Sequence, residues 1–170
     1  MAVLDICVYP DPVLREKARP IDIVDGAVRK LMDDMAETMY NAPGIGLAAN
    51  QVGRPVRLIV IDLQREEDPH GLIMLVNPEI IEASGELIWE EGCLSVPEFF
   101  AQVQRHENVV VRGLNADGKP VEIRADGLLA VVLQHEIDHL NGRLFIDHLN
   151  PIKRDMFKRK WKKRLLEASA

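Results

Sequence analysis

The sequence predicts an α+β domain in which mixed or antiparallel strands pack around a central helix, with a further helix at the C-terminal end. Three observations point to this class. Apolar residues recur at helical spacing over residues 25–41, and residues 127–141 are apolar nearly all round. Between these segments lie short runs rich in valine and isoleucine, separated by turn residues. The order helix, strands, helix, helix is not the alternating βαβ pattern of a parallel sheet.

The chain of 170 residues is long enough to bury a core, and its 47% hydrophobic and 28% charged residues are typical of globular proteins. We see no linker or internal repeat, so we expect a single domain over residues 1–170. The first residues lack the pattern of a signal peptide, and no run of about 18 apolar residues could span a membrane. With only two cysteines, the chain is expected to be cytoplasmic and to have no membrane partner.

The first helix is expected over residues 25–41 and ends at the breaker Asn41-Ala42-Pro43-Gly44. Its methionines lie on one apolar stripe, which favours a place in the core over a binding surface. The expected strands are residues 57–63, 72–76, 79–88, 108–114 and 120–124, the last two joined by the hairpin turn Asn115-Ala116-Asp117-Gly118.

The central helix is expected over residues 127–141, with Asp126 as its N-cap and Gly142 at its end. Because it is apolar on nearly every side, it should lie in the core.

The last segment, residues 153–170, is expected to form a basic helix. It holds eight basic and two acidic residues, a formal charge of +6, which leaves −12 on residues 1–152. This division fits a polyanionic partner for residues 153–164, and it equally fits a solvated helix whose charges pair with the acidic body.

The stretch His135-Glu136-Ile137-Asp138-His139 predicts a metal site on the central helix. Histidines four residues apart project from one face of a helix, so their ring nitrogens can share an ion at about 2.0–2.1 Å. Glu136 would lie beside the ion but outside its ligands, where a general base for water belongs. The competing interpretation, histidines satisfied within an apolar core, would bury ionisable groups without a partner.

The third ligand decides the kind of site. A zinc endopeptidase would use a downstream histidine or glutamate, but Phe145 occupies the histidine position and the next glutamate is Glu167. The remaining candidates are Cys93, Cys7, Asp147 and His148. Cys93 is favoured because it lies where a strand opens into a loop. One cysteine and two histidines would leave a fourth position for water, as in catalytic sites.

Three motifs, in order, resemble those of the peptide deformylases. They are Gly44-Ile45-Gly46-Leu47-Ala48-Ala49-x-Gln51, Glu91-Gly92-Cys93-Leu94-Ser95 and Gln134-His135-Glu136-x-Asp138-His139. Pro10-Asp11-Pro12-x-Leu14-Arg15 and Asp117-Gly118-Lys119-Pro120 are also similar, so the resemblance extends to about residue 151. It implies a single catalytic domain that removes the N-formyl group from the N-terminal methionine of newly made polypeptides and releases formate.

The resemblance also implies the roles of individual residues. One divalent ion, natively iron(II), with zinc, nickel or cobalt as alternatives, would be the only cofactor, and its ligands would be Cys93, His135 and His139. Glu136 would act as general acid and base, while the Gln51 amide and the Leu94 N–H would stabilise the oxyanion. Thiolate ligation suits such ions and excludes magnesium and calcium.

The substrate implied by the resemblance is an extended N-formylmethionyl peptide. Backbone groups of Ile45, Gly46 and Gly92 would pair with it like an added strand. A slot for the methionine side chain needs apolar walls, for which the candidates, each of which could equally be plain core, are Ile45, Ile88, Leu128, Val131 and Val132.

Two positions near these motifs bear on selectivity and support. Many family members have arginine where this chain has Phe100, so the rim of the site is expected to be more apolar. Arg105 is similar to a family arginine that would pair with Glu91, although a surface salt bridge is the competing interpretation. The alternative function is a ribosome- or RNA-associated binding protein acting through residues 153–164, and ribosome contact there is also compatible with a deformylase.

Overall fold

The structure is a computed structural model and describes residues 2–168. Its principal elements in chain order are α1 (Gly26–Asn41), β1 (Gly46–Ala48), β2 (Leu58–Ile61), β3 (Ile73–Ser84), β4 (Leu87–Cys93), β5 (Val96–Arg105), β6 (Asn108–Leu114), β7 (Pro120–Asp126), α2 (Gly127–Leu140) and α3 (Pro151–Ala168). Short 3₁₀ helices are η1 (Pro12–Arg15), η2 (Ala49–Val52) and η3 (Phe145–His148).

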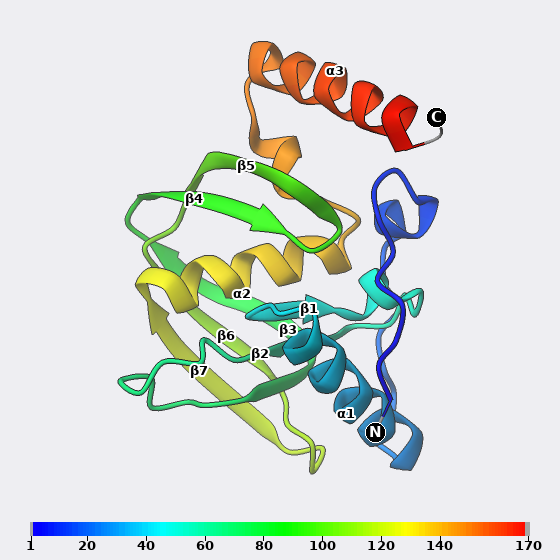
Figure 1. Cartoon of the computed structure of the whole chain (residues 1–170). Coiled ribbons are helices and arrows are strands. Elements are labelled where there is room, and N and C mark those ends of the chain that lie inside the picture. Colours follow the sequence, from blue (N-terminus) through cyan, green and yellow to red (C-terminus); the bar gives the residue numbers. More distant parts are fainter. Residues whose placement is uncertain (1, 169–170) are drawn as a thin grey trace.

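The strands form two antiparallel sheets with α2 between them (Figure 1). One sheet has five strands in the order β1-β2-β3-β6-β7, and β4 pairs with β5 in the other. All pairings between these named strands are antiparallel. In Figure 1, α3 lies beyond the β4–β5 pair. The predicted α+β class, with strands around a central helix and a helix at the C-terminal end, is confirmed.

Helices cover both faces of the five-stranded sheet. Ile59 of β2 belongs to the core that α2 shares through Leu133, whereas Leu58 belongs to the core that α1 shares through Met35. All residues of β2 are therefore buried, which explains its continuous apolar run. The methionines of α1 are fully buried, as the prediction of core packing required.

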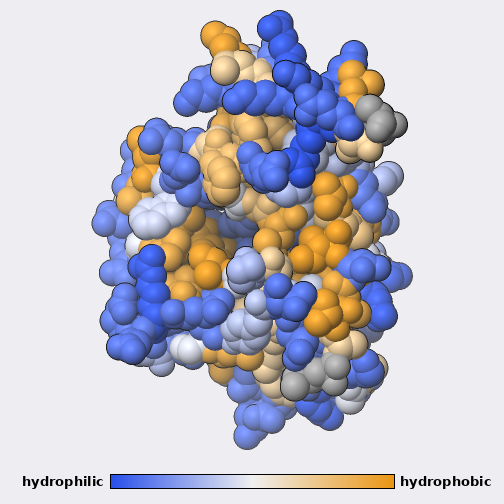
Figure 2. All heavy atoms as spheres, viewed as in Figure 1, coloured by the Kyte–Doolittle hydropathy of each residue, from blue (hydrophilic) through white to orange (hydrophobic). Residues whose placement is uncertain are grey.

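A third apolar cluster attaches α3 to the body. Phe157 and Trp161 are buried against Tyr9 and Phe99, and the Trp161 ring nitrogen donates to the Tyr9 carbonyl at 3.1 Å. The basic side chains of α3 lie mostly outside this cluster, and its surface is largely hydrophilic in Figure 2. Among residues 2–168, no helix combines the length and apolarity needed to cross a membrane.

The strands around residues 73–93 differ from the expected ones. β3 continues through Asn77-Pro78 instead of breaking there, because the register shifts between Val76 and Glu79 and Asn77 adopts a φ of 52°. Such a bulge accommodates the proline without ending the strand. β3 ends at Ser84, and β4 begins at Leu87 and runs on to Cys93, beyond the expected end at residue 88.

The two ends of α2 are fixed in different ways. Asp126 occupies the N-cap position, but its side chain makes no capping hydrogen bond. Gly142 follows the C-terminal end with a φ of 74°, and a Cβ there would lie 2.4 Å from the Arg15 carbonyl oxygen. Only glycine suits that backbone and that approach. Arg57 adds a hydrogen bond of 3.0 Å to the Leu140 carbonyl, so the end that carries the histidines is held firmly.

Candidate metal centre

Cys93, His135 and His139 bring one ligand atom each to a common point. The Nε2 atoms of the two histidines lie 3.2 Å apart, and the Cys93 Sγ lies 3.3 Å from Nε2 of His139. All three atoms lie within 4.8 Å of one another. Four-residue spacing on α2 places the two rings on one face, and the bulge between Glu91 and Cys93 ends β4 against it.

This donor set fits a metal ion. Two nitrogens that bind one tetrahedral ion at about 2.1 Å lie roughly 3.4 Å apart, close to the spacing observed. The Nδ1–H of His135 donates to Glu91 Oε1 at 2.8 Å, which leaves the Nε2 lone pair facing the cluster. Burial lowers the pKa of His139 well below its ordinary value, so this ring is a neutral ligand.

The charges around the cluster favour a cation. Burial disfavours a charged ring at His135, yet hydrogen bonds with Cys93 and Glu91 and the charge of Glu136 raise its pKa well above the ordinary value. A proton or a metal ion would satisfy the same negative surroundings. Both rings and Glu91 are buried. A metal ion, unlike a proton, can bind Cys93 Sγ and the Nε2 atoms of both histidines at once.

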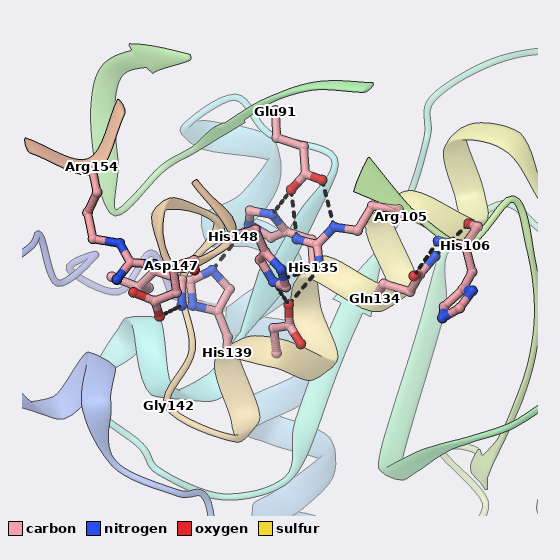
Figure 3. Close-up of polar contacts among 12 residues, drawn as sticks. Glu91, Arg105, His106, Gln134, His135, His139, Gly142, Asp147, His148 and Arg154 are labelled. Atoms are coloured by element: carbon pink, nitrogen blue, oxygen red, sulfur yellow. Dashed lines mark hydrogen bonds and ion pairs between the residues drawn. The ribbon is translucent and has the colours of Figure 1, made fainter. Parts of the chain in front are cut away.

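Arg105 holds Glu91 in place, and Glu91 in turn orients the ring of His135 (Figure 3). It donates to both oxygens of Glu91, at 2.7 and 2.9 Å, and to Asp138 at 2.6 Å. Burial alone would raise the pKa of Glu91, but hydrogen bonds from Arg105 and His135 lower it to about 2. The side chains of Glu91 and Arg105 are both 4% exposed, so their pair is buried and is not a surface salt bridge.

The Gln51 amide has a defined orientation beside the cluster. The Ala48 N–H can only donate, and it does so to Gln51 Oε1 at 2.9 Å. The Nε2 atom consequently faces Ser95 Oγ at 3.0 Å and Cys93 Sγ at 3.6 Å. Its N–H groups therefore point toward Cys93 and Ser95.

Glu136 lies against the glycine of β1. Its side chain is buried, with Oε1 unpaired within residues 2–168, and burial raises its pKa to about 7. A Cβ on Gly46 would lie 2.5 Å from Glu136 Oε2 and 3.0 Å from Val132 Cγ1. With any larger residue at position 46, the Glu136 carboxylate would have to move away from β1.

A cavity of about 450 Å³ opens beside these groups. It is lined by the ligands Cys93 and His135, by Glu136, Gln51 and Leu94, and by Ile45, Gly46, Gly92, Leu128, Val131 and Val132. Figure 2 shows hydrophobic surface around the hollow in the middle of this face. A larger hollow of about 580 Å³ over β3, β6 and β7 has no cysteine or histidine in its lining.

Ile88 does not line this cavity, which corrects the expectation from the sequence. Its side chain is 64% exposed because alternate residues of β4 face opposite sides. Trp89 lines the cavity instead and shares its side of the strand with Glu91. The sequence could have indicated Trp89, because it lies two residues before Glu91 and four before Cys93. Residues at such even spacing in a strand face the same side.

The other ligand candidates lie apart from the cluster. Asp147 pairs with Arg15 at 2.6 Å, and His148 contacts Asp138 at 2.9 Å as part of the supporting network. Cys7 is not in the group of ligand atoms found among the described residues. Ser95, which sequence reasoning did not single out, holds the Gln51 amide.

The half-buried thiol, the two buried imidazoles, the adjacent carboxylate and the open cavity together define a metal-dependent hydrolase. Comparison with known proteins narrows this class. A family model described as polypeptide deformylase matches residues 3–155, and the chain belongs to that family. The resemblance of the three motifs is therefore confirmed.

Relatives and solved structures agree with this assignment. The chain is 68% identical over 170 residues to the peptide deformylase of Syntrophobacter fumaroxidans, with full coverage of both chains. It is 53% identical to that of Bartonella henselae over 98% of this chain and 96% of the relative. The Legionella pneumophila deformylase structure superposes with a TM-score of 0.90 at 48% identity, covering 99% of each chain. The structure of an Ehrlichia chaffeensis peptide deformylase in complex with actinonin superposes with a TM-score of 0.90 at 41% identity, covering 96% of this chain and 98% of that one.

Gly46→Ala is expected to lower kcat for deformylation by about 100-fold, because the added methyl group would displace Glu136, the residue predicted to act as general acid and base. Steady-state kinetics at saturating metal would measure it. Gly26→Ala is the control, since a Cβ there meets nothing within 4 Å. Unchanged kcat in the Gly46 variant would show that Glu136 is not constrained by β1.

Glu91→Gln is expected to weaken metal binding by about 10–100-fold, because the amide orients His135 less firmly and leaves the Arg105 charge poorly compensated. Competition against a chelator would measure the affinity. The neighbouring Glu90→Gln removes the same charge from an exposed position and should leave affinity unchanged. Equal losses in both variants would contradict a specific role for Glu91.

Proposed function

We propose that Cys93, His135 and His139 bind one divalent metal ion and that Glu136 transfers protons during removal of the formyl group from N-formylmethionyl peptides. The observation that carries this proposal is the convergence of three ligand atoms within 4.8 Å beside a buried carboxylate. The chain's membership of the polypeptide deformylase family supplies the reaction, hydrolysis of a formamide to formate and a free amine.

When bound, the ion would polarise the formyl group and lower the pKa of water, so that hydroxide would be available to attack near neutral pH. We propose iron(II) as the native ion, with zinc, nickel or cobalt as functional substitutes. A thiolate with two imidazoles supports ions of this softness and disfavours magnesium and calcium.

Glu136 is proposed to carry the proton from the attacking water to the leaving amine nitrogen. The water oxygen forms a bond to the formyl carbon, and the C–N bond then breaks. A pKa of about 7, raised by burial, suits a group that must both accept and donate a proton near neutrality. Gly46 supports the role, because the absence of a Cβ there leaves room for Oε2 beside β1.

The developing negative charge on the formyl oxygen is proposed to meet two donors of the chain. These are Nε2 of Gln51 and the backbone N–H of Leu94, which lies one residue beyond the thiol ligand. Removal of one such donor typically costs about 10²–10³ in rate. The bond from Ala48 supports this role for Gln51, since it prevents the amide from presenting its oxygen.

The peptide substrate is proposed to add a strand beside β1. β1 is an edge strand of the five-stranded sheet, so one side of its backbone is not occupied by β2. Ile45 and Gly46 would pair with the peptide on one side of the cavity, and Gly92 on the other. The methionine side chain would enter the apolar part, where Trp89 takes the place once expected for Ile88, together with Leu128, Val131 and Val132.

We further propose that residues 1–170 act as one catalytic domain and that the protein works in the cytoplasm, where newly made polypeptides carry the formyl group. The shared aromatic cluster of Tyr9, Phe99, Phe157 and Trp161 supports a single unit, because it ties α3 to the chain's first residues and to β5.

Glu136→Gln is expected to reduce formate release from formyl-Met-Ala-Ser by about 10²–10⁴ while leaving metal affinity nearly unchanged, since the amide keeps the shape but transfers no proton. Formate would be measured with iron-loaded protein prepared without oxygen. Wild-type protein with one bound ion but no formate release would overturn the proposal and favour the ribosome- or RNA-binding alternative. An equally active variant would exclude Glu136 as the proton carrier.

Ribosome contact through residues 153–164 is proposed as an additional property, supported by the exposed basic side chains of α3. Deletion of the segment would remove buried Phe157 and Trp161, so charge reversal is the better test. Lys158→Glu with Lys162→Glu should weaken ribosome binding. The slope of log K for ribosome binding against log salt concentration should also fall in magnitude by about 2. The control, Lys17→Glu with Lys119→Glu, makes the same change at exposed positions outside α3. Equal effects of both pairs would contradict a specific contact.

A further inference from the structure

A groove of about 480 Å³ separates α3 from the beginning of β5. Its α3 wall consists of Lys160, Trp161, Lys163, Arg164 and Glu167, and its other wall is residues 97–100. Those same four residues also line the catalytic cavity. Residues 97–100 are therefore a wall common to the cavity and the groove, so the two hollows are neighbours.

The common wall offers an apolar surface. Phe100 is 62% exposed, and its ring lies so close to Gly92 that a Cβ there would be 2.5 Å from it. The ring thus lies against the backbone of the metal-binding loop at Gly92, and most of its surface remains exposed. An exposed aromatic face at the mouth of a cavity suits contact with a passing peptide.

The charged groups of the groove are not all equivalent. Glu98 forms an ion pair with Arg164, whose guanidinium also lies 5.3 Å from the centre of the Trp161 ring. Glu98 has a φ of 64°, an uncommon conformation for a residue with a side chain. Lys160 and Lys163 take part in none of the ion pairs found within residues 2–168.

We propose that this groove binds the part of the peptide substrate that follows the residues held in the cavity, with a preference for acidic side chains opposite Lys160 and Lys163. The inference rests on the proposed function. An extended peptide advances about 3.3 Å per residue, so the preference should fall on one or two adjacent positions and not along the whole chain. Because the contact is the same in the bound substrate and in the transition state, it lowers KM and leaves kcat unchanged.

The test uses formyl-Met octapeptides in which a single Asp or Lys is moved through positions three to seven. At low salt, wild-type kcat/KM should favour Asp over Lys by about two- to fivefold at one or two adjacent positions. Lys160→Glu with Lys163→Glu should abolish or reverse this preference. Lys158→Glu with Lys162→Glu changes the same charge on residues of α3 that do not line the groove, and should keep it.

Formyl-Met-Ala, too short to reach the groove, should be hydrolysed equally by all these proteins. Loss of the Asp preference at about 0.5 M salt would support the charge contact, because screening is then strong. A wild-type enzyme without a position-dependent preference, or the same shift in both double variants, would overturn the inference and leave the proposed function intact. Failure of the wild type on formyl-Met-Ala would overturn both.

Discussion

The buried pair of Glu91 and Arg105 joins the two halves of the catalytic site. Glu91 comes from β4 and accepts a hydrogen bond from the His135 ring on α2. Arg105, at the end of β5, neutralises that carboxylate and also donates a hydrogen bond to Asp138. Breaking such a buried pair by removing one partner typically costs about 3–5 kcal/mol. The pair therefore fixes the distance between Cys93, two residues beyond Glu91, and the histidines, and every proposed step depends on that distance.

The packing of α2 follows from the same requirement. Its histidines can be held rigidly only if the helix is buried on both sides, and it lies between the five-stranded sheet and the β4–β5 pair. Gln134 adds a second link between the layers, because its side chain bonds both backbone groups of His106 at the turn after β5. Burial also raises the pKa of Glu136, so one structural feature orients the proposed ligands and tunes the proposed proton carrier.

Small residues allow the walls of the cavity to approach one another. Gly46 admits Glu136, Gly92 admits the Phe100 ring, and a Cβ on Gly44 would lie 2.8 Å from the Leu94 side chain. The three contacts bring β1, the metal-binding loop and β5 around one space. The same wall at residues 97–100 lies between this space and the groove beside α3. The site of the proposed chemistry is therefore next to the basic surface of α3, whereas the rest of the protein is acidic.

The sequence by itself determined the α+β class, the central helix and its histidines, because helical and strand periodicities and a four-residue ligand spacing are local properties. The motifs also pointed to the family before any fold was known. Only the tertiary structure decided that Asn77-Pro78 continues a strand, that Trp89 replaces Ile88 in the cavity, and that the Arg105 pair is buried. Strand register, the facing of alternate side chains and burial all depend on which segments pack together, and that is set by contacts between residues far apart in the chain.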